Sequence, residues 1–188
     1  MLHKAARWIT EWSFMQSENK EDREVVEYGI EIFLETIIKF VILICIGAVI
    51  GRFTETLLIL AVFSGIRISA GGIHARTSMG CTVTMLLVVV VSLIAADKVL
   101  IPIWGSAMCF GISTLIIIRY SPNGSQANEL LDKEEKINKR KWALLIVLFF
   151  CILSILAEYR SLILTAVFLE MATIIMAAVK EEERDAEI

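Results

Sequence analysis

Six long apolar runs, separated by short polar segments, dominate this chain. They cover residues 32–51, 56–70, 81–96, 99–118, 142–157 and 162–179. A helix of roughly 20 apolar residues crosses the ~30 Å hydrocarbon core of a bilayer, where backbone polar groups must bond to one another. The sequence therefore predicts an all-α, polytopic membrane protein. Because the second and third runs are short, we expect four to six true spans.

The composition agrees with this class. Hydrophobic residues make up 57% of the 188 residues, and the mean hydropathy is +0.72, well above that of an ordinary soluble domain. Nothing repeats at a fixed period and no linker divides the chain, so we expect one integral membrane domain over residues 1–188. The expected surroundings are the lipid bilayer, with no nucleic-acid partner.

The N-terminal region, residues 1–28, is predicted to lie on the membrane surface. Its start lacks the continuous apolar core and cleavage site of a signal peptide, so we expect none. Apolar and aromatic side chains recur there at spacings that suit a helix in the headgroup zone, namely Leu2, Ala5, Trp8, Ile9, Trp12 and Phe14. We expect an amphipathic interfacial helix; a disordered tail is the alternative.

The basic residues predict the orientation. With six spans, one side holds fourteen of the 18 lysines and arginines: Lys4, Arg7, Lys20, Arg23, Arg67, Arg76, Arg119, Lys133, Lys136, Lys139, Arg140, Lys141, Lys180 and Arg184. The other side holds Arg52, Lys98 and Arg160, and Lys39 lies within the first run. Positive charge collects in cytoplasmic segments. Both termini, the loop 119–141 and the tail 180–188 are therefore expected in the cytoplasm.

The polar loop 119–141 divides into a turn and a helix. Ser121-Pro122-Asn123-Gly124 is a strong turn signal, and helix-forming residues over 127–141 predict a short cytoplasmic helix. Its basic end, residues 139–141, is expected to anchor the fifth span in the headgroups; a surface for a charged partner is the alternative.

Small and charged residues within the apolar runs have two interpretations. Gly47 with Gly51, and Ala107 with Gly111, have the spacing of close helix contacts, which can lie within the chain or form a homodimer. Charges in spans are structural pairs or functional groups. Those concerned are Glu31, Glu35, Lys39, Glu55 and Glu170, of which Glu170 has no partner nearby in the sequence.

Residues 67–81, RISAGGIHARTSMGC, break the apolar pattern, and we expect covalent chemistry in this segment, assigned as a catalytic loop over 65–81. A catalytic cysteine acts as a thiolate, which a neighbouring histidine and a helix N-terminus both favour. Thr77 or Ser78 can cap the third apolar helix, and if Ser78 is the cap, Cys81 falls in its first turn. Free backbone N–H groups there could also hold an oxyanion.

His74 is expected to lie off that helix. Seven residues along one helix separate two positions by about 10.5 Å, too far for a hydrogen bond between the side chains. The chain must turn between His74 and Cys81, and Gly71-Gly72 supply the backbone freedom. Candidates for a residue that orients the histidine are Ser64, Ser69 and Glu55.

These residues also have plainer interpretations. A single histidine near a membrane boundary can be an ordinary interfacial residue, and a cysteine in an apolar segment is usually an inert thiol, as expected of Cys45, Cys109 and Cys151. His74 and Cys81 fall short of the four ligands of a structural zinc site, so we expect neither metal nor cofactor. The alternative function is a non-enzymatic membrane carrier or scaffold that uses the charges in the spans.

The string Arg67-x4-Gly72-x-His74-x6-Cys81 resembles the signature of the accessory gene regulator B (AgrB) family, bacterial membrane endopeptidases that mature quorum-sensing propeptides. The chain length, the apolar segments, the amphipathic N-terminal region and the turn Tyr120-Ser121-Pro122 extend the resemblance over the whole chain. Family members often have Ala where Ser121 stands and a more basic loop after it, so this chain could select a different peptide.

The resemblance implies a mechanism. His74 and Cys81 would be the catalytic pair, and Arg67 and Gly72 match further motif positions; Arg67 would pair with a substrate acid or anchor its span in the headgroups. The substrate would be an AgrD-like propeptide with an acidic tail. Cys81 would release the tail and hold the peptide as a thioester until an internal Cys or Ser closes a thiolactone or lactone ring. The site would face the cytoplasm from a multi-pass protein of the bacterial cell membrane.

Overall fold

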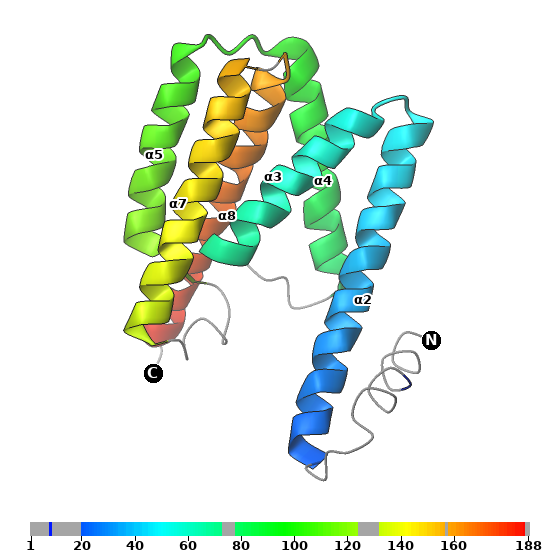
Figure 1. Cartoon of the computed structure of the whole chain (residues 1–188), viewed down its shortest axis with the longest axis vertical. Coiled ribbons are helices and arrows are strands. Elements are labelled where there is room, and N and C mark those ends of the chain that lie inside the picture. The colour runs from blue at the N-terminus through cyan, green and yellow to red at the C-terminus, as the bar shows by residue number, and fades with distance from the viewer. Residues whose placement is uncertain (1–7, 9–19, 73–77, 124–131, 157, 187–188) are drawn as a thin grey trace.

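Helices make up most of the part of the chain that the computed structural model describes, which is residues 8, 20–72, 78–123, 132–156 and 158–186 (Figure 1). The helices are α2 (Lys20–Val49), α3 (Phe53–Ala70), α4 (Ser78–Lys98), α5 (Trp104–Tyr120), α7 (Lys133–Leu156) and α8 (Arg160–Ala186). The predicted all-α class is confirmed. The predicted N-terminal interfacial helix lies outside the described residues, except for the exposed Trp8.

Four helices of the described chain are long and apolar enough to cross a membrane. These segments are Gly29–Val49, Phe53–Ala70, Met79–Lys98 and Arg160–Lys180. The two runs predicted to be short both extend as helices: α3 has 18 residues and α4 has 21, which correspond to about 27 and about 31 Å. α5 is apolar but has 17 residues, and α7 begins with charged turns. The chain is a polytopic helical membrane protein.

Two predicted boundaries were wrong. The run 99–118 becomes helical only at Trp104, because Pro102 has no N–H and disfavours helical geometry in the residue before it. Residues 133–141 of the short helix predicted over 127–141 are helical, but they form the first part of α7, which runs unbroken from Lys133 to Leu156 with no Gly or Pro to interrupt it. The backbone N–H of Asp132 donates to Glu135 Oε2 at 3.3 Å, as in a capping box. Residues 127–131 lie outside the described ranges.

The helices alternate in direction, so their ends gather at two ends of the molecule (Figure 1). The α2–α3 turn, the end of α4 and the turn between α7 and α8 lie at the upper end of that view, together with Arg52, Lys98 and Arg160. The start of α2, the α3–α4 break and the end of α8 face the lower end. The alternation agrees with the sides predicted for the cations, while the assignment of the lower end to the cytoplasm stays a prediction.

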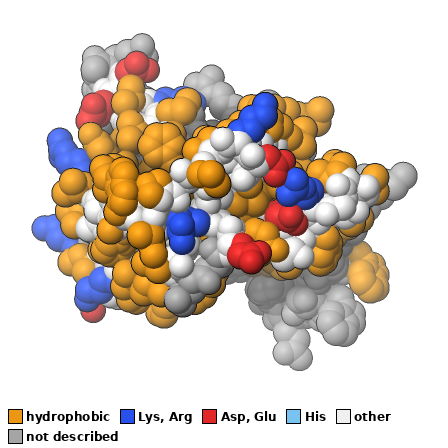
Figure 2. All heavy atoms as spheres, turned by 90° about the horizontal axis from the view of Figure 1, so that it is seen from above, with side chains coloured by type: hydrophobic (Ala, Val, Ile, Leu, Met, Phe, Trp, Pro, Cys, Tyr) orange, Lys and Arg blue, Asp and Glu red, His pale blue; other side chains and the backbone are white. Residues whose placement is uncertain are grey.

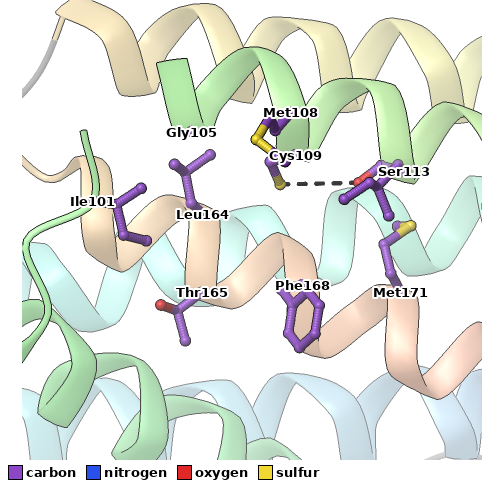
Figure 3. A pocket seen from close by; sticks show the side chains of 10 residues that line it. Ile101, Gly105, Met108, Cys109, Ser113, Leu164, Thr165, Phe168 and Met171 are labelled. Carbon is purple, nitrogen blue, oxygen red and sulfur yellow. Dashed lines mark hydrogen bonds between the residues drawn. The ribbon is translucent and has the colours of Figure 1, made fainter. Parts of the chain in front are cut away.

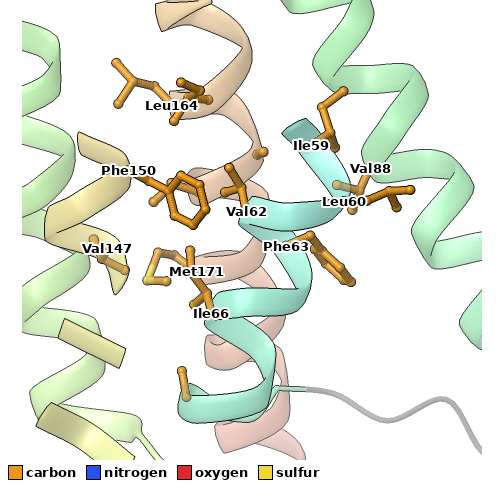
Figure 4. Packing of buried hydrophobic residues seen from close by; sticks show 14 of the residues in the cluster. Ile59, Leu60, Val62, Phe63, Ile66, Val88, Val147, Phe150, Leu164 and Met171 are labelled. Atoms are coloured by element: carbon orange, nitrogen blue, oxygen red, sulfur yellow. The ribbon is translucent and has the colours of Figure 1, made fainter. Parts of the chain in front are cut away.

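α3 occupies the centre of the bundle. Its buried residues are Thr56, Ile59, Leu60, Val62, Phe63, Ile66 and Ala70. They pack against α4, α7 and α8 (Figure 4). By contrast, α2 buries only Leu43 and Gly47 among its residues of described exposure, and its N-terminal half extends away from the bundle (Figure 1).

Ion pairs join the helices at the upper end. Arg52 donates to Asp97 at 2.8 and 3.0 Å and to Glu55 at 3.2 Å, which connects the α2–α3 turn to the end of α4. The hydrogen bonds with Asp97 and then Glu55 raise the pKa of the Arg52 guanidinium above its ordinary value, so it stays charged. Figure 2 views the molecule from this end and shows charged side chains as small groups among hydrophobic ones.

The two small-residue patterns have different surroundings. A Cβ on Gly47 would collide with the side chain of Thr56, so glycine lets α2 approach α3 closely. Gly51, with a φ of 74°, belongs to the turn that follows. On α5, nothing lies within 4 Å of where a Cβ of Gly111 would stand, so that pattern faces away from the bundle. A homodimer through it stays a prediction.

We predict that Gly47→Ala loosens the contact between α2 and α3, because the added methyl group overlaps Thr56. Overpacking of this kind costs about 1–3 kcal/mol, which lowers the melting temperature by roughly 2–10 °C at this chain length. Circular dichroism of the detergent-solubilised protein measures the change. Gly111→Ala is the matched control and should melt with the wild type; equal melting of both variants would contradict the contact.

Candidate active site

The segment predicted to carry the chemistry lies where α3 gives way to α4. α3 ends at Ala70 and α4 begins at Ser78, so both ends of the predicted loop 65–81 are helical. Gly71 and Gly72 have φ angles of 83° and 130°, in the left-handed region that favours glycine. The pair therefore has the backbone conformation that glycine was expected to allow, while the turn expected between His74 and Cys81 stays a prediction. Residues 73–77, with His74 among them, lie outside the described ranges.

Asn123, just after α5, ties this break to α8. Its carbonyl oxygen accepts the Gly72 N–H at 3.3 Å, and the two chain segments form an isolated parallel bridge between Gly71 and Asn123. Its side-chain Nδ2 donates to the Ile174 carbonyl at 3.0 Å. A Cβ on Gly71 would collide with the Asn123 carbonyl, so this approach requires glycine.

Three further hydrogen bonds satisfy carbonyl groups at the helix ends next to the break. Ser121 Oγ donates to the Ala70 carbonyl at 3.0 Å, and Arg140 of α7 donates to the Ser121 carbonyl at 2.8 and 3.0 Å. Carbonyl groups at helix ends need such donors, above all where lipid replaces water. Arg140 was predicted within a basic headgroup anchor, and this contact gives it an internal role.

A buried ion pair lies beside the break. Arg67 Nη1 is 3.7 Å from Glu170 Oε1, and the two side chains are 16% and 0% exposed. The guanidinium carbon also lies 5.3 Å from the centre of the Phe63 ring, within the range of a cation–π contact. Arg67 was expected to meet headgroups or a substrate acid. In the structure, the acid that it meets is Glu170.

Gly72 packs directly on this pair. A Cβ built on Gly72 would stand 2.8 Å from Thr173 Oγ1, 3.3 Å from Glu170 Oε1 and 3.4 Å from Arg67 Nη1. The Thr173 hydroxyl donates to the backbone carbonyl of Glu170 at 3.0 Å. Since it has no side chain, Gly72 allows the backbone of the break to lie on polar groups of α3 and α8.

Cys81 lies in the first turn of α4, as predicted. Its thiol is free and half-buried, and it packs against the hydrophobic core. Cys81 lies on one stripe of the helix with the buried residues Met85, Val88 and Ser92, and α4 packs against α3 and α8. Cys81 therefore lies on the inward face of α4. One of the helices that this face packs against is α8, which also contacts Gly72 through Glu170 and Thr173.

A cavity of about 310 Å³ lies elsewhere, between α5 and α8 (Figure 3). Cys109 lines it, with its Sγ 4.0 Å from Ser113 Oγ. The lining residues come from α5, α8 and Ile101, and none of them belongs to α4 or carries a charge. This cavity is therefore separate from Cys81, and its lining gives Cys109 neither a base nor an ion-pair partner.

The residues proposed to orient His74 are not grouped at the break. Ser64 donates to Leu60 of its own helix at 2.6 Å, and Glu55 pairs with Arg52 at the upper end; Ser69 is half-buried on α3. Sequence reasoning missed Asn123 and Thr173 as neighbours of the break. Glu170 did give a signal in the sequence, because it is a single carboxylate in an apolar run. Its partner Arg67 could not be identified, because it lies about 100 residues away in the sequence.

The sequence profile described as AgrB, accessory gene regulator B, matches residues 2–178 of this chain. A protein of Clostridium acetobutylicum, described only as AgrB-like, is 31% identical over 120 residues, which cover 64% of this chain and 57% of that relative. AgrB-like proteins of Listeria monocytogenes and Halalkalibacterium halodurans are 24% and 26% identical, over 82% and 80% of this chain and 79% and 75% of their own lengths.

No solved structure matches the chain. The profile match covers α2 to α7 and α8 as far as residue 178, and it includes the whole string from Arg67 to Cys81. The chain therefore belongs to the accessory gene regulator B family.

Proposed function

We propose that this protein is a membrane-embedded cysteine endopeptidase that cleaves the C-terminal tail from an AgrD-like propeptide and promotes closure of a thiolactone or lactone ring. Membership of the AgrB family supports propeptide processing as the general role. The observation that carries the specific mechanism is the position of Cys81, half-buried in the first turn of α4, directly after a break held by Gly71 and Gly72.

In the first step, the Cys81 thiolate attacks the carbonyl carbon at the junction between the peptide and its tail. The peptide C–N bond breaks, the new C–S bond leaves the peptide as a thioester on Cys81, and the tail departs with a proton from the His74 imidazolium. The exposed N–H groups of the first helical turn are suited to hold the oxyanion of the tetrahedral intermediate. Dividing one acyl transfer into two steps is ordinary covalent catalysis.

In the second step, a thiol or hydroxyl group within the peptide attacks the thioester carbonyl. His74 accepts its proton, the ring closes, and Cys81 leaves as a thiolate. Exchange of one thioester for another is nearly balanced in energy, so water must be kept from the carbonyl to prevent hydrolysis. The position of Cys81 on the inward face of α4, against the hydrophobic core, suits this requirement.

The alternative of a carrier finds less support. A carrier that uses charges in its spans needs them along one path. Glu35 instead pairs with Lys39 on α2 at 3.1 Å, and Glu55 pairs with Arg52 at the upper end. Glu170 pairs with Arg67 beside the break. These are three separate ion pairs, and the third lies beside Gly72.

We predict that Cys81→Ala abolishes release of the propeptide tail, because no acyl-enzyme can form. His74→Ala should slow release by about 100- to 10,000-fold, the usual contribution of a positioned general base. The measurement is co-expression of each variant with a propeptide that carries a C-terminal tag, followed by mass spectrometry of the cleaved tail. Cys45→Ala, which removes an exposed thiol on α2, is the matched control and should process normally.

Matched amounts of each variant in the membrane are required for this comparison. A trapped thioester between Cys81 and the peptide would identify the intermediate directly. Tail release by Cys81→Ala at the wild-type rate would refute the proposed function.

We also predict that Gly72→Ala impairs processing, because an L side chain is strained at a φ of 130° and its Cβ would press on Thr173 Oγ1. Such backbone strain costs about 1–3 kcal/mol. Gly65→Ala on α3 is the control, since its Cβ would meet Ile146 Cγ2 at an ordinary 3.5 Å. Tail release should fall in the first variant only; equal rates in both would show that the break tolerates side chains.

A further inference from the structure

Glu170 is a carboxylate in the middle of a membrane helix, with no exposed surface on its side chain. Both of its oxygens lack a hydrogen-bond donor among the described residues, and the charged group that it faces is Arg67. Burying a carboxylate is costly unless an opposite charge compensates it. The position of the Arg67 side chain and that of Glu170 therefore depend on each other.

This pair bears directly on the backbone of the break. Glu170 Oε1 and Arg67 Nη1 lie 3.3 and 3.4 Å from where a Cβ of Gly72 would stand, and Thr173, one helical turn after Glu170, lies closer still. The Gly72 N–H is held from the other side by Asn123, whose side chain is itself bonded to α8 at Ile174. Gly72 is thus in contact both with Asn123 and with the polar side chains of Glu170 and Thr173 on α8.

The same helix supports the element that carries Cys81. α4 packs against α8 along its buried stripe, and the chain has few residues in which to pass from Gly72 to the start of α4 at Ser78. If the Arg67–Glu170 pair were lost, Gly72 could move on α8 while α4 kept its own contacts with that helix, and Gly72 would then move relative to Cys81. In a reaction that needs reacting atoms within about 3–3.5 Å of one another, such a shift is costly.

We propose that Glu170 is a positioning residue of the proposed peptidase: through its ion pair with Arg67, it fixes Gly72 relative to Cys81. The proposal rests on the proposed function. It differs from a purely structural role, because it requires the charges themselves. A variant in which apolar residues replace the Arg67–Glu170 pair should therefore fold but release the propeptide tail slowly.

The experiment compares three variants with the wild type in native membranes. Glu170→Gln removes the charge but keeps the shape. Arg67→Met with Glu170→Met removes both charges and fills the space, which avoids a buried charge without a partner. Glu55→Gln is the matched control, since that carboxylate also pairs with an arginine, at the upper end. Each variant is assayed for tail release and melting temperature. Mass spectrometry then gives the rate of Cys81 alkylation by iodoacetamide, with Cys45 as internal reference.

We expect Glu170→Gln to slow tail release by about 100-fold, the effect of a misplacement of about 1 Å, and to change the ratio of Cys81 to Cys45 alkylation. The double Met variant should melt close to the wild type yet process as slowly as Glu170→Gln. Glu55→Gln should match the wild type in all three measurements. Wild-type processing by the double Met variant, or by Glu170→Gln, would overturn the proposal.

The alkylation ratio separates this proposal from the proposed function. If the wild type releases no tail, or Cys81→Ala releases it equally, the peptidase mechanism fails on its own. In that case, a changed ratio in Glu170→Gln and in the double variant would still show that the pair positions Cys81. An unchanged ratio in both would refute positioning, whatever the chemistry of the site.

Discussion

A chain that leaves the helical path within reach of a bilayer must supply hydrogen-bond partners for the peptide groups that it exposes there. The end of α3 shows how this chain meets that requirement. Ser121 donates to the Ala70 carbonyl, and Asn123 accepts the Gly72 N–H. Arg140 in turn satisfies the Ser121 carbonyl. The break in α3 therefore depends on the segment after α5 and on the start of α7, which fold against it from elsewhere in the chain.

The same region explains why two charges can be buried here. Arg67 and Glu170 neutralise each other, the Phe63 ring covers the guanidinium, and Gly72 leaves room for both. A pair of this kind does little for stability compared with hydrophobic residues of the same volume. Its retention in the centre of a membrane protein is better explained by what it holds in place. The placement of both partners beside the Gly-Gly break is the basis for that explanation.

Much of the fold could be predicted from the sequence, because a membrane helix can be recognised from the length and hydropathy of a single segment. The helix class and all six apolar segments were predicted on that basis. The start of α5 was wrong by a few residues, because the apolar run conceals the effect of Pro102. The continuity of α7 was missed, because a change from charged to apolar composition suggests a boundary where the backbone has none.

The candidate site could be predicted only in part from the sequence. The unusual backbone conformation of Gly71 and Gly72 and the place of Cys81 in a first helical turn follow from local chemistry and were predicted on that basis. The pairing of Arg67 with Glu170, and the contact of Asn123 with Gly72, join positions far apart in the chain. Nothing in a single sequence fixes such contacts, since they depend on how the helices pack in three dimensions.

The unbroken course of α7 gives the molecule a mechanical property. Its first turns are charged and precede the apolar part, and Arg140 lies at the transition, bonded to the Ser121 carbonyl. An α-helix is stiff along its axis, so the charged first turns of α7 and its apolar part tilt together. Any tilt of α7 is then carried through Arg140 to Ser121 and to the end of α3. The charged start of α7 and the Gly-Gly break are therefore mechanically connected through Arg140 and Ser121.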